Sequence, residues 1–285
     1  MAEPAIEGFT ASDGYTWRYR RFGASGRFET RRAIVVGLHG IQSHSGWYLE
    51  SSQSLADAGY DVSFLDRRGC GLNDRDRGDA PGFRRLLDDV AEYLATLPRP
   101  RFVMAISWGG KLAVALQRRH PGICDGIILI APGLRPRVKP GVGERLRVIA
   151  ARVVARRRMF PIPLNDPELF TDNAERQGFI RDDPLMLRRA TARMLFENGR
   201  LDVYLRFAAR RVSVPVLLLL AEHDRIIDNA ATRRFVERFP AVDRTVNEYA
   251  GAHHTLEFEP GGPPFVEDML RWLAERSLER PAAAL

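Results

Sequence analysis

The chain has 285 residues, 45% of them hydrophobic, which is enough for one large domain or for a core with an inserted subdomain. Its two cysteines are too few for a disulfide framework, and no apolar run reaches the roughly 18 residues of a membrane-spanning helix. The formal charge of +7 comes almost entirely from arginine, but no zinc-finger, RNP or helix-turn-helix pattern accompanies it, so nucleic acid is not an expected partner. The N-terminal sequence lacks the features of a signal peptide, and we expect a cytoplasmic protein.

Strand-like and helix-like segments alternate along most of the chain. Residues 6–23 contain two short strand-like pieces around a turn sequence at residues 12–14. Apolar strands are then expected in residues 32–40, 61–71, 101–107, 125–133, 214–224 and 243–254, and helices in residues 47–60, 81–98, 108–121, 229–240 and 263–279. The helix at residues 81–98 has the clearest pattern, because apolar residues recur there at steps of three and four from Phe83 to Leu97.

This alternation predicts an open α/β sheet, mostly parallel, with helices on both faces. The pattern is interrupted from residue 134 to residue 211, where the sequence is helical or irregular. We therefore expect a core formed by residues 1–133 and 212–285 and an insertion formed by residues 134–211. Such an insertion should lie over the carboxyl ends of the strands, where open α/β sheets bind their ligands.

The sequence AISWGG, residues 105–110, places a serine between an expected strand and an expected helix. A sharp turn there would expose Ser107 at the edge of the sheet, and it requires small residues two positions before and after, here Ala105 and Gly109. A serine hydroxyl becomes an effective nucleophile when a base removes its proton. On this motif alone, Ser107 is either a nucleophile or a serine that caps the next helix.

A base and an orienting carboxylate follow later in the chain. His253 and His254 lie in the loop after the last expected strand, and the residues alone leave either of them as the base. Asp224 ends a strand and is the natural carboxylate, with Glu222 and Asp228 as rivals. The chain order of serine, aspartate and histidine, each at a strand end, is the order of the α/β-hydrolase arrangement.

An oxyanion hole requires two backbone N–H groups that point to the developing negative charge. Trp108 directly follows the serine and supplies one candidate N–H. Ile41 follows the expected strand at residues 32–40 and supplies the other, while Gly40 allows a close approach of the backbone. A His-Gly pair is also a common turn, so this prediction depends on its combination with the serine.

From about residue 34 to residue 273, the chain resembles the monoacylglycerol lipase-like branch of the α/β-hydrolases. The stretch LHGIQSHSGWYLESSQSLADAGYDVSFLDRRGCG is similar to that branch's pattern of H-G, H-S-G-x-Y, A-x-x-G-Y and D-x-R-G-x-G. AISWGG, VPVLLLLAEHDRIID and GAHHTLEFE take the places of G-H-S-M-G-G, P-x-L-x-x-x-G-x-x-D-x-(I/V)-(I/V)-D and G-x-x-H-x-(L/I)-x-x-E. The resemblance implies an α/β-hydrolase fold with an inserted helical cap, and a site with Ser107 as nucleophile, Asp224 as acid, His254 as base, and Ile41 and Trp108 as oxyanion donors.

Four positions depart from this pattern. Ala105 and Ile106 replace the glycine and histidine before the nucleophile, Cys70 replaces a histidine, and Ala221 replaces a glycine before the acid. None of these changes removes a catalytic group, but Ile106 and Trp108 alter the lining near the serine. The resemblance thus implies hydrolysis of a carboxylic ester, with a monoacyl lipid as the candidate substrate.

The insertion carries two features that each allow two interpretations. Residues 143–160 mix apolar residues with six arginines and form either a basic amphipathic helix that contacts an anionic lipid surface or a solvated face over a packed stripe. The large apolar residues of the insertion either line an acyl tunnel or form the core of the cap itself. The candidates for the lining are Phe160, Phe170, Leu195 and Phe196.

The preferred hypothesis is a serine carboxylester hydrolase that uses a Ser-His-Asp triad and an acyl-enzyme intermediate. The same triad acting on a thioester, an amide or an acyl acceptor is the alternative, followed by a non-hydrolytic protein of the same fold that binds a ligand. A dehalogenase or epoxide hydrolase is disfavoured, because it needs an aspartate in place of Ser107. The expected partner is a small acyl ester, and no metal or cofactor is expected, since no histidines and carboxylates have ligand spacing.

Overall fold

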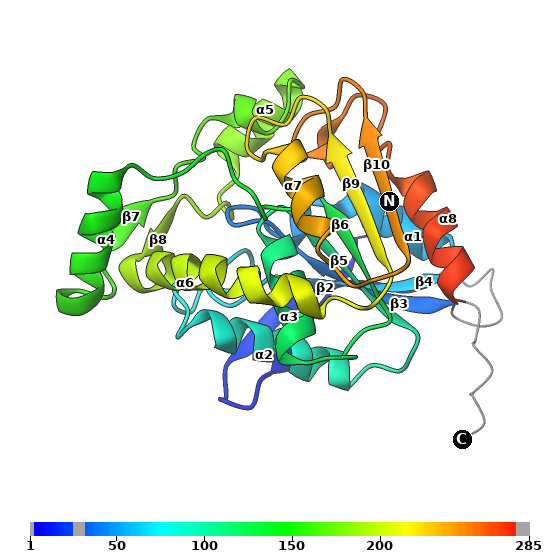
Figure 1. Ribbon diagram of the computed structural model, residues 1–285, viewed down its shortest axis with the longest axis horizontal. Helices are drawn as coiled ribbons and strands as arrows, with labels where there is room; N and C mark the ends of the chain where they lie inside the picture. Colours follow the sequence, from blue (N-terminus) through cyan, green and yellow to red (C-terminus); the bar gives the residue numbers. More distant parts are fainter. Residues whose placement is uncertain (1–2, 25–31, 278–285) are drawn as a thin grey trace.

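The computed structural model describes residues 3–24 and 32–277, and within these ranges an eight-stranded mixed sheet forms the centre of the molecule (Figure 1). The strand order is β1-β2-β4-β3-β5-β6-β9-β10; β1 pairs antiparallel with β2 and β2 with β4, and every other pair is parallel. The strands are β1 (Ala5–Thr10), β2 (Thr16–Phe22), β3 (Ala33–Leu38), β4 (Tyr60–Leu65), β5 (Arg101–Ile106), β6 (Gly126–Ile130), β9 (Val216–Ala221) and β10 (Arg244–Tyr249). This arrangement confirms the predicted fold class.

The central strands are apolar because helices cover both faces of the sheet. Every residue of β3, β5, β6 and β9 is buried, which matches the uninterrupted apolar runs of their sequences. Neighbouring strands also pack tightly at Gly37 of β3, where an added Cβ would lie 2.5 Å from Cδ2 of Phe64. The strands in the middle of the sheet are therefore fixed in register, and their carboxyl ends meet at one edge.

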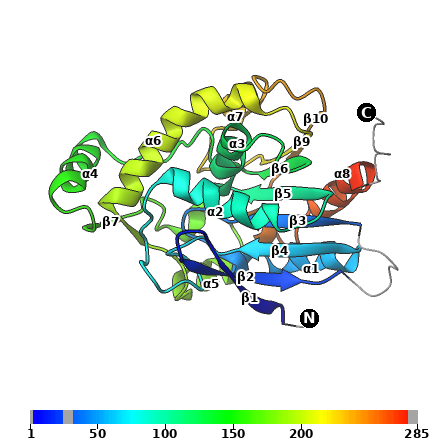
Figure 2. The ribbon, with the colours of Figure 1, turned by 90° about the horizontal axis from the view of Figure 1, so that it is seen from below.

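Five helices flank the sheet: α1 (Leu49–Asp57), α2 (Phe83–Ala95), α3 (Gly109–Arg119), α7 (Asn229–Val236) and α8 (Val266–Ser277). Helix α1 contacts α8, and α2 contacts α3. Figures 1 and 2 show that these two pairs cover opposite faces of the sheet. The amphipathic pattern predicted for residues 81–98 holds, because Phe83, Leu87 and Leu94 of α2 are all buried. Residues 278–279, the end of the predicted last helix, lie outside the described residues.

The segment between β6 and β9 leaves the sheet and returns to it. It contains α4 (Val142–Val154), β7 (Met159–Pro161), α5 (Ala174–Asp182), β8 (Arg189–Thr191) and α6 (Ala192–Ala208), with short 3₁₀ turns at Pro167–Leu169 and Ala209–Arg211. Figures 1 and 2 place α4 farthest from the sheet, while α6 packs against both α3 and α4. The expectation of helical or irregular structure missed the antiparallel pair β7–β8; the role of this segment as a cap stays a prediction.

Candidate active site

Ser107 occupies the sharp turn between β5 and α3. Its backbone has a φ of 51°, and its N–H donates to the carbonyl of Ile130 at 2.9 Å, which fixes the turn against β6. Gly109 is required two residues later, because an added Cβ would lie 2.3 Å from the carbonyl oxygen of Leu38. Ala105 replaces the glycine of the family motif without strain, because it lies within β5, before the turn, and is fully buried between β3 and β6.

His254 brings an imidazole to the Ser107 hydroxyl. Its Nε2 lies 2.9 Å from Oγ of Ser107, and its Nδ1 lies 2.7 Å from Oδ2 of Asp224. His254 and Asp224 are buried, with relative exposures of 2% and 3%. The other carboxylate oxygen of Asp224 accepts the backbone N–H groups of Ile226 and Ile227, each at 2.8 Å. The carboxylate is therefore held rigidly behind the imidazole, with Nδ1 protonated and Nε2 free to accept the serine proton.

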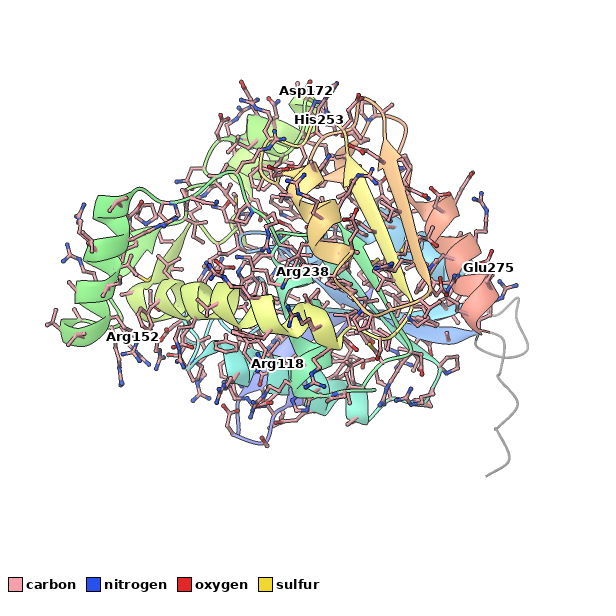
Figure 3. The ribbon with its side chains drawn as sticks, in the orientation of Figure 1. Arg118, Arg152, Asp172, Arg238, His253 and Glu275 are labelled. Carbon is pink, nitrogen blue, oxygen red and sulfur yellow. The ribbon has the colours of Figure 1, made fainter. Side chains whose placement is uncertain are left out.

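The rival residues point elsewhere. His253 turns away from Ser107, and its Nε2 lies 2.9 Å from a carboxylate oxygen of Asp172, as the side chains at the top of Figure 3 show. Asp228 caps α7 by accepting the N–H of Ala231 at 2.8 Å, and Glu222 accepts the N–H of Gly251 at 2.7 Å. The structure thus brings together Ser107, His254 and Asp224. The side chains of His253, Asp228 and Glu222, which the sequence left as alternatives, take no part in this hydrogen-bonded chain.

The two expected oxyanion donors lie beside Ser107. Ile41, Ser107 and Trp108 share the wall of one cavity, and an added Cβ on Gly40 would lie only 3.4 Å from Cβ of Ser107. Within the described residues, neither the N–H of Ile41 nor that of Trp108 donates a hydrogen bond to another protein group. Both donors are therefore available to a ligand at the serine, which is the arrangement that an oxyanion hole needs.

A cavity of about 780 Å³ opens from Ser107 toward α4 and α6. Leu195 and Phe196 line it, as predicted lining residues, together with Ile162 and Leu164. Phe170 lies on the wall of a smaller adjoining space that also contacts Ser107 and His254. Phe160 is placed differently: it packs with Val148, Ala151 and Ala192 in a small second core beneath α4. The cavity is large enough for an acyl chain and a small headgroup.

Charged and polar groups line the cavity on the side of α3 and α6. Lys111 is buried and pairs with Asp202 at 2.6 Å, and Asn198 accepts the indole N–H of Trp108 at 2.7 Å. These contacts fix the ring of Trp108 against α6. Across residues 3–24 and 32–277, no group of three or more histidine, cysteine or carboxylate side chains is arranged to hold a metal ion.

Sequence reasoning missed two residues next to the candidate oxyanion hole. Asn198 holds Trp108 from α6, and Arg67, two residues after the end of β4, donates to the carbonyls of Gly40 and Ile41. No motif marks either residue, because Asn198 lies between β6 and β9, outside every quoted motif, and Arg67 is one of many arginines. For Arg67, one signal was available: it lies just past the apolar part of β4, at the edge of the sheet where the site was expected.

Comparison with known proteins identifies the family and the fold of the chain. Residues 29–261 match the family described as serine aminopeptidase, S33 (Hydrolase_4), which covers well over half of the chain. Lysophospholipase L2 of Escherichia coli K12 is 29% identical over 283 residues, covering 88% of this chain and 81% of the relative. Monoacylglycerol lipase of Mycolicibacterium smegmatis is 28% identical over 253 residues, covering 85% and 88%.

The solved structure of monoacylglycerol lipase from Paleococcus ferrophilus superposes with a TM-score of 0.82 at 23% identity, covering 95% of this chain and 99% of that one. The fold is therefore that of an α/β-hydrolase. The chain belongs to the S33 (Hydrolase_4) family of α/β-hydrolases, whose relatives include esterases and lipases. The family resemblance inferred from the motifs is confirmed.

Proposed function

We propose that this protein is a serine carboxylester hydrolase that cleaves monoacylglycerols or closely related monoacyl esters. The observation that carries the proposal is the hydrogen-bonded chain from Ser107 through His254 to Asp224, with distances of 2.9 and 2.7 Å. A family match and relatives named as a monoacylglycerol lipase and a lysophospholipase support the same chemistry.

In this mechanism, Oγ of Ser107 attacks the ester carbonyl while Nε2 of His254 accepts the hydroxyl proton. The negative charge that forms on the carbonyl oxygen is stabilised by the N–H groups of Ile41 and Trp108. His254 then gives its proton to the leaving alcohol, and the acyl group remains on Ser107. Water, deprotonated by His254, releases the fatty acid, while Asp224 keeps the imidazole oriented and stabilises its charged form.

The cavity supports a monoacyl substrate. Its apolar residues Ile162, Leu164, Leu195 and Phe196 provide a surface for an acyl chain, and Ser107 in its wall is placed to meet the ester. The polar groups around Asn198 suit the glycerol end, since an alcohol headgroup needs hydrogen-bond partners when it leaves water.

The test is hydrolysis of p-nitrophenyl esters from acetyl to palmitoyl and of 1-monoacylglycerols, with wild type compared to Ser107→Ala. Serine-dependent turnover that peaks at medium or long chains supports the proposal. Turnover confined to the shortest esters, or higher turnover of thioesters or aminoacyl p-nitroanilides, would instead assign the same triad to another acyl substrate. The absence of serine-dependent turnover on every substrate would refute it.

We also propose that α4 contacts an anionic lipid surface. Val142, Leu146, Ile149, Val153 and Val154 are exposed, with Val153 and Val154 at 83% and 84%. Five arginines on and just after the same helix are exposed as well: Arg145, Arg147, Arg156, Arg157 and Arg158. Apolar side chains interleaved with cations match the chemistry of an anionic membrane surface. No helix in residues 3–24 or 32–277 is long and apolar enough to cross a membrane.

A further inference from the structure

Arg67 reaches behind the loop that carries Ile41. Its Nη1 donates to the carbonyl of Gly40 at 2.6 Å, and its Nη2 donates to the carbonyl of Ile41. The backbone N–H of Arg67 also donates to Nε2 of His39 at 3.1 Å. One residue that follows β4 therefore holds three consecutive residues that follow β3.

His39 reinforces the same contact. Because its Nε2 accepts the N–H of Arg67, its Nδ1 carries the proton and donates to the carbonyl of Gly40 at 2.7 Å. Burial, and after it the positive charge of Arg67, lowers the pKa of His39 well below its ordinary value, so the ring is neutral. The Gly40 carbonyl thus receives two hydrogen bonds, one of them from a charged donor.

This carbonyl belongs to the same peptide group as the N–H of Ile41. Hydrogen bonds to a carbonyl polarise the amide and make its N–H a stronger donor. They also fix the plane of the peptide, which determines the direction of the Ile41 N–H. Arg67 and His39 therefore act on the candidate oxyanion donor from the side opposite the substrate.

Arg67 also contacts Trp108, whose backbone N–H is the second candidate oxyanion donor. Its guanidinium lies over the indole of Trp108, with Cζ 4.8 Å from the ring centroid. The edge of the Trp108 ring is held by Asn198, which accepts the indole N–H at 2.7 Å. One guanidinium thus contacts both segments that carry the candidate donors: the peptide groups around the Ile41 N–H and the side chain of Trp108.

The carboxylate of Asp66 acts on the charge of Arg67 from beyond ion-pair distance. Within the described residues, no carboxylate lies within ion-pair distance of Arg67, and its buried Nε has no hydrogen-bond partner. The adjacent Arg68 differs, since it pairs with Asp89 at 2.5 Å and with Asp13 at 2.9 Å. A partly buried cation without a direct ion pair keeps much of its field directed at the loop that it binds.

We propose that Arg67 is a positioning residue that orients and polarises the oxyanion hole formed by Ile41 and Trp108. The inference rests on the proposed function, because it assigns Arg67 to the transition state of that reaction. Arg67 occupies a position left unspecified in the D-x-R-G-x-G stretch. Its effect should appear in the transition state and not in the binding of the ground-state ester.

The experiment compares Arg67→Met and Arg67→Lys with wild type and with the matched control Arg101→Met. Arg101 is a buried arginine that, like the partly buried Arg67, donates to backbone carbonyls, here those of Ile123, Leu97 and Leu94, but it lies at the start of β5, far from Ser107. The six residues of β5 place it roughly 17–20 Å from Ser107. The readouts are kcat and KM on a p-nitrophenyl ester, the inhibition constant of an alkyl trifluoromethyl ketone, and the melting temperature.

The ketone forms a tetrahedral adduct whose oxygen carries the negative charge that the ester develops in the transition state. We expect Arg67→Met to lower kcat by about 10- to 100-fold, with KM almost unchanged. This reduction is at most as large as the one that follows removal of an oxyanion donor. Affinity for the ketone should fall by the same factor. For Arg67→Lys, kcat and the affinity for the ketone should lie between those of wild type and Arg67→Met, since lysine keeps the charge but not the forked geometry. Arg101→Met should lower only the melting temperature.

Two results would overturn the proposal. In the first, folded Arg67→Met binds the ketone and turns over ester as wild type does. In the second, Arg101→Met reduces kcat as much as Arg67→Met, which would make the effect one of general stability. If Arg67→Met does not fold, Arg67→Lys decides by the same criterion. A wild type that neither hydrolyses esters nor binds the ketone would refute the proposed function, and this inference with it.

Discussion

Asp224 divides its two carboxylate oxygens between His254 and its own loop. Oδ2 lies 2.7 Å from Nδ1 of His254, while Oδ1 accepts the N–H groups of Ile226 and Ile227 at 2.8 Å each. The loop contacts fix the carboxylate, which, together with the edge-on ring of Phe170, orients the imidazole toward Ser107. This division explains how the residue at the end of β9 acts on a histidine thirty residues later.

Asp224→Asn should reduce kcat on the order of 10⁴-fold, by analogy with other triads. An asparagine oxygen still accepts from the loop, but the amide that faces His254 then donates and favours the wrong tautomer. Asp228→Asn is the control, because Asp228 caps α7 and does not contact His254. Kinetics on a medium-chain p-nitrophenyl ester check both variants, and a larger loss in Asp228→Asn would show that the wrong acid has been assigned.

The adjacent histidines should respond very differently to alanine substitution. His254→Ala removes the base, so we expect a loss of kcat of at least about 10²-fold. His253→Ala removes side-chain contacts with Asp172, Glu259 and His223, none of which reaches Ser107, and should leave kcat within about threefold because the base is kept. The two rate constants, measured at one pH on one ester, check this directly. Equal losses in both variants would contradict the assignment of the base.

Glu257 should make the stability of the protein depend on pH. It is buried three residues after His254, its Oε1 accepts the N–H of Ser51 at 2.9 Å, and its Oε2 has no partner among the described residues. Burial, aided by the charge of Glu50, raises the pKa of Glu257 to about 7. Between its ordinary pKa of 4.5 and 7, the folded state holds a proton that the unfolded state has lost, so stability falls as pH rises.

Glu257→Gln should remove this loss, because the amide oxygen can still accept from Ser51 and carries no charge. At pH 8.5 the variant should be more stable than wild type by roughly 3 kcal/mol, and at pH 4.5 the two should differ little. Urea unfolding at both pH values measures the difference in unfolding free energy. A difference that is the same at both pH values would show that Glu257 is not protonated near neutrality.

The exposed face of α4 should bind anionic vesicles. We expect sedimentation with phosphatidylcholine vesicles that contain phosphatidylglycerol, and at least about tenfold weaker binding after Val153→Asp with Val154→Asp. Val242, 98% exposed in the loop before β10, supplies the control Val242→Asp, which should bind as wild type does. Equal binding by all three proteins, or binding that ignores phosphatidylglycerol, would contradict the proposed contact.

The order of strands and helices in the core could be predicted because burial on both faces leaves a readable apolar pattern. The runs around β5 and β9 are apolar throughout, and the steps of three and four in α2 mark one packed face. The antiparallel pair β7–β8 could not be predicted in this way. Each strand has three residues, which is too short for an alternation to appear.

The part of the site that could be predicted is the set of residues that follow the strands of the sheet. Ser107, Asp224 and His254 each follow a strand whose carboxyl end meets the same edge, so topology alone brings them near one another. The choice of His254 over His253 required the family pattern, because both follow β10 in one loop. Phe160 shows a second limit, since an aromatic side chain is buried equally by a ligand cavity and by a core, and here it lies in a core.

The central claim, that His254 activates Ser107 as a nucleophile, is tested most directly by the rate at which an alkyl fluorophosphonate modifies the protein. Intact mass gives the rate, and peptide mapping locates the adduct, for wild type, Ser107→Ala, His253→Ala and His254→Ala. We predict one adduct on Ser107, formed at similar rates in wild type and His253→Ala, slowed at least about 100-fold in His254→Ala, and absent in Ser107→Ala. An adduct on another residue, or an unchanged rate in His254→Ala, would contradict the account.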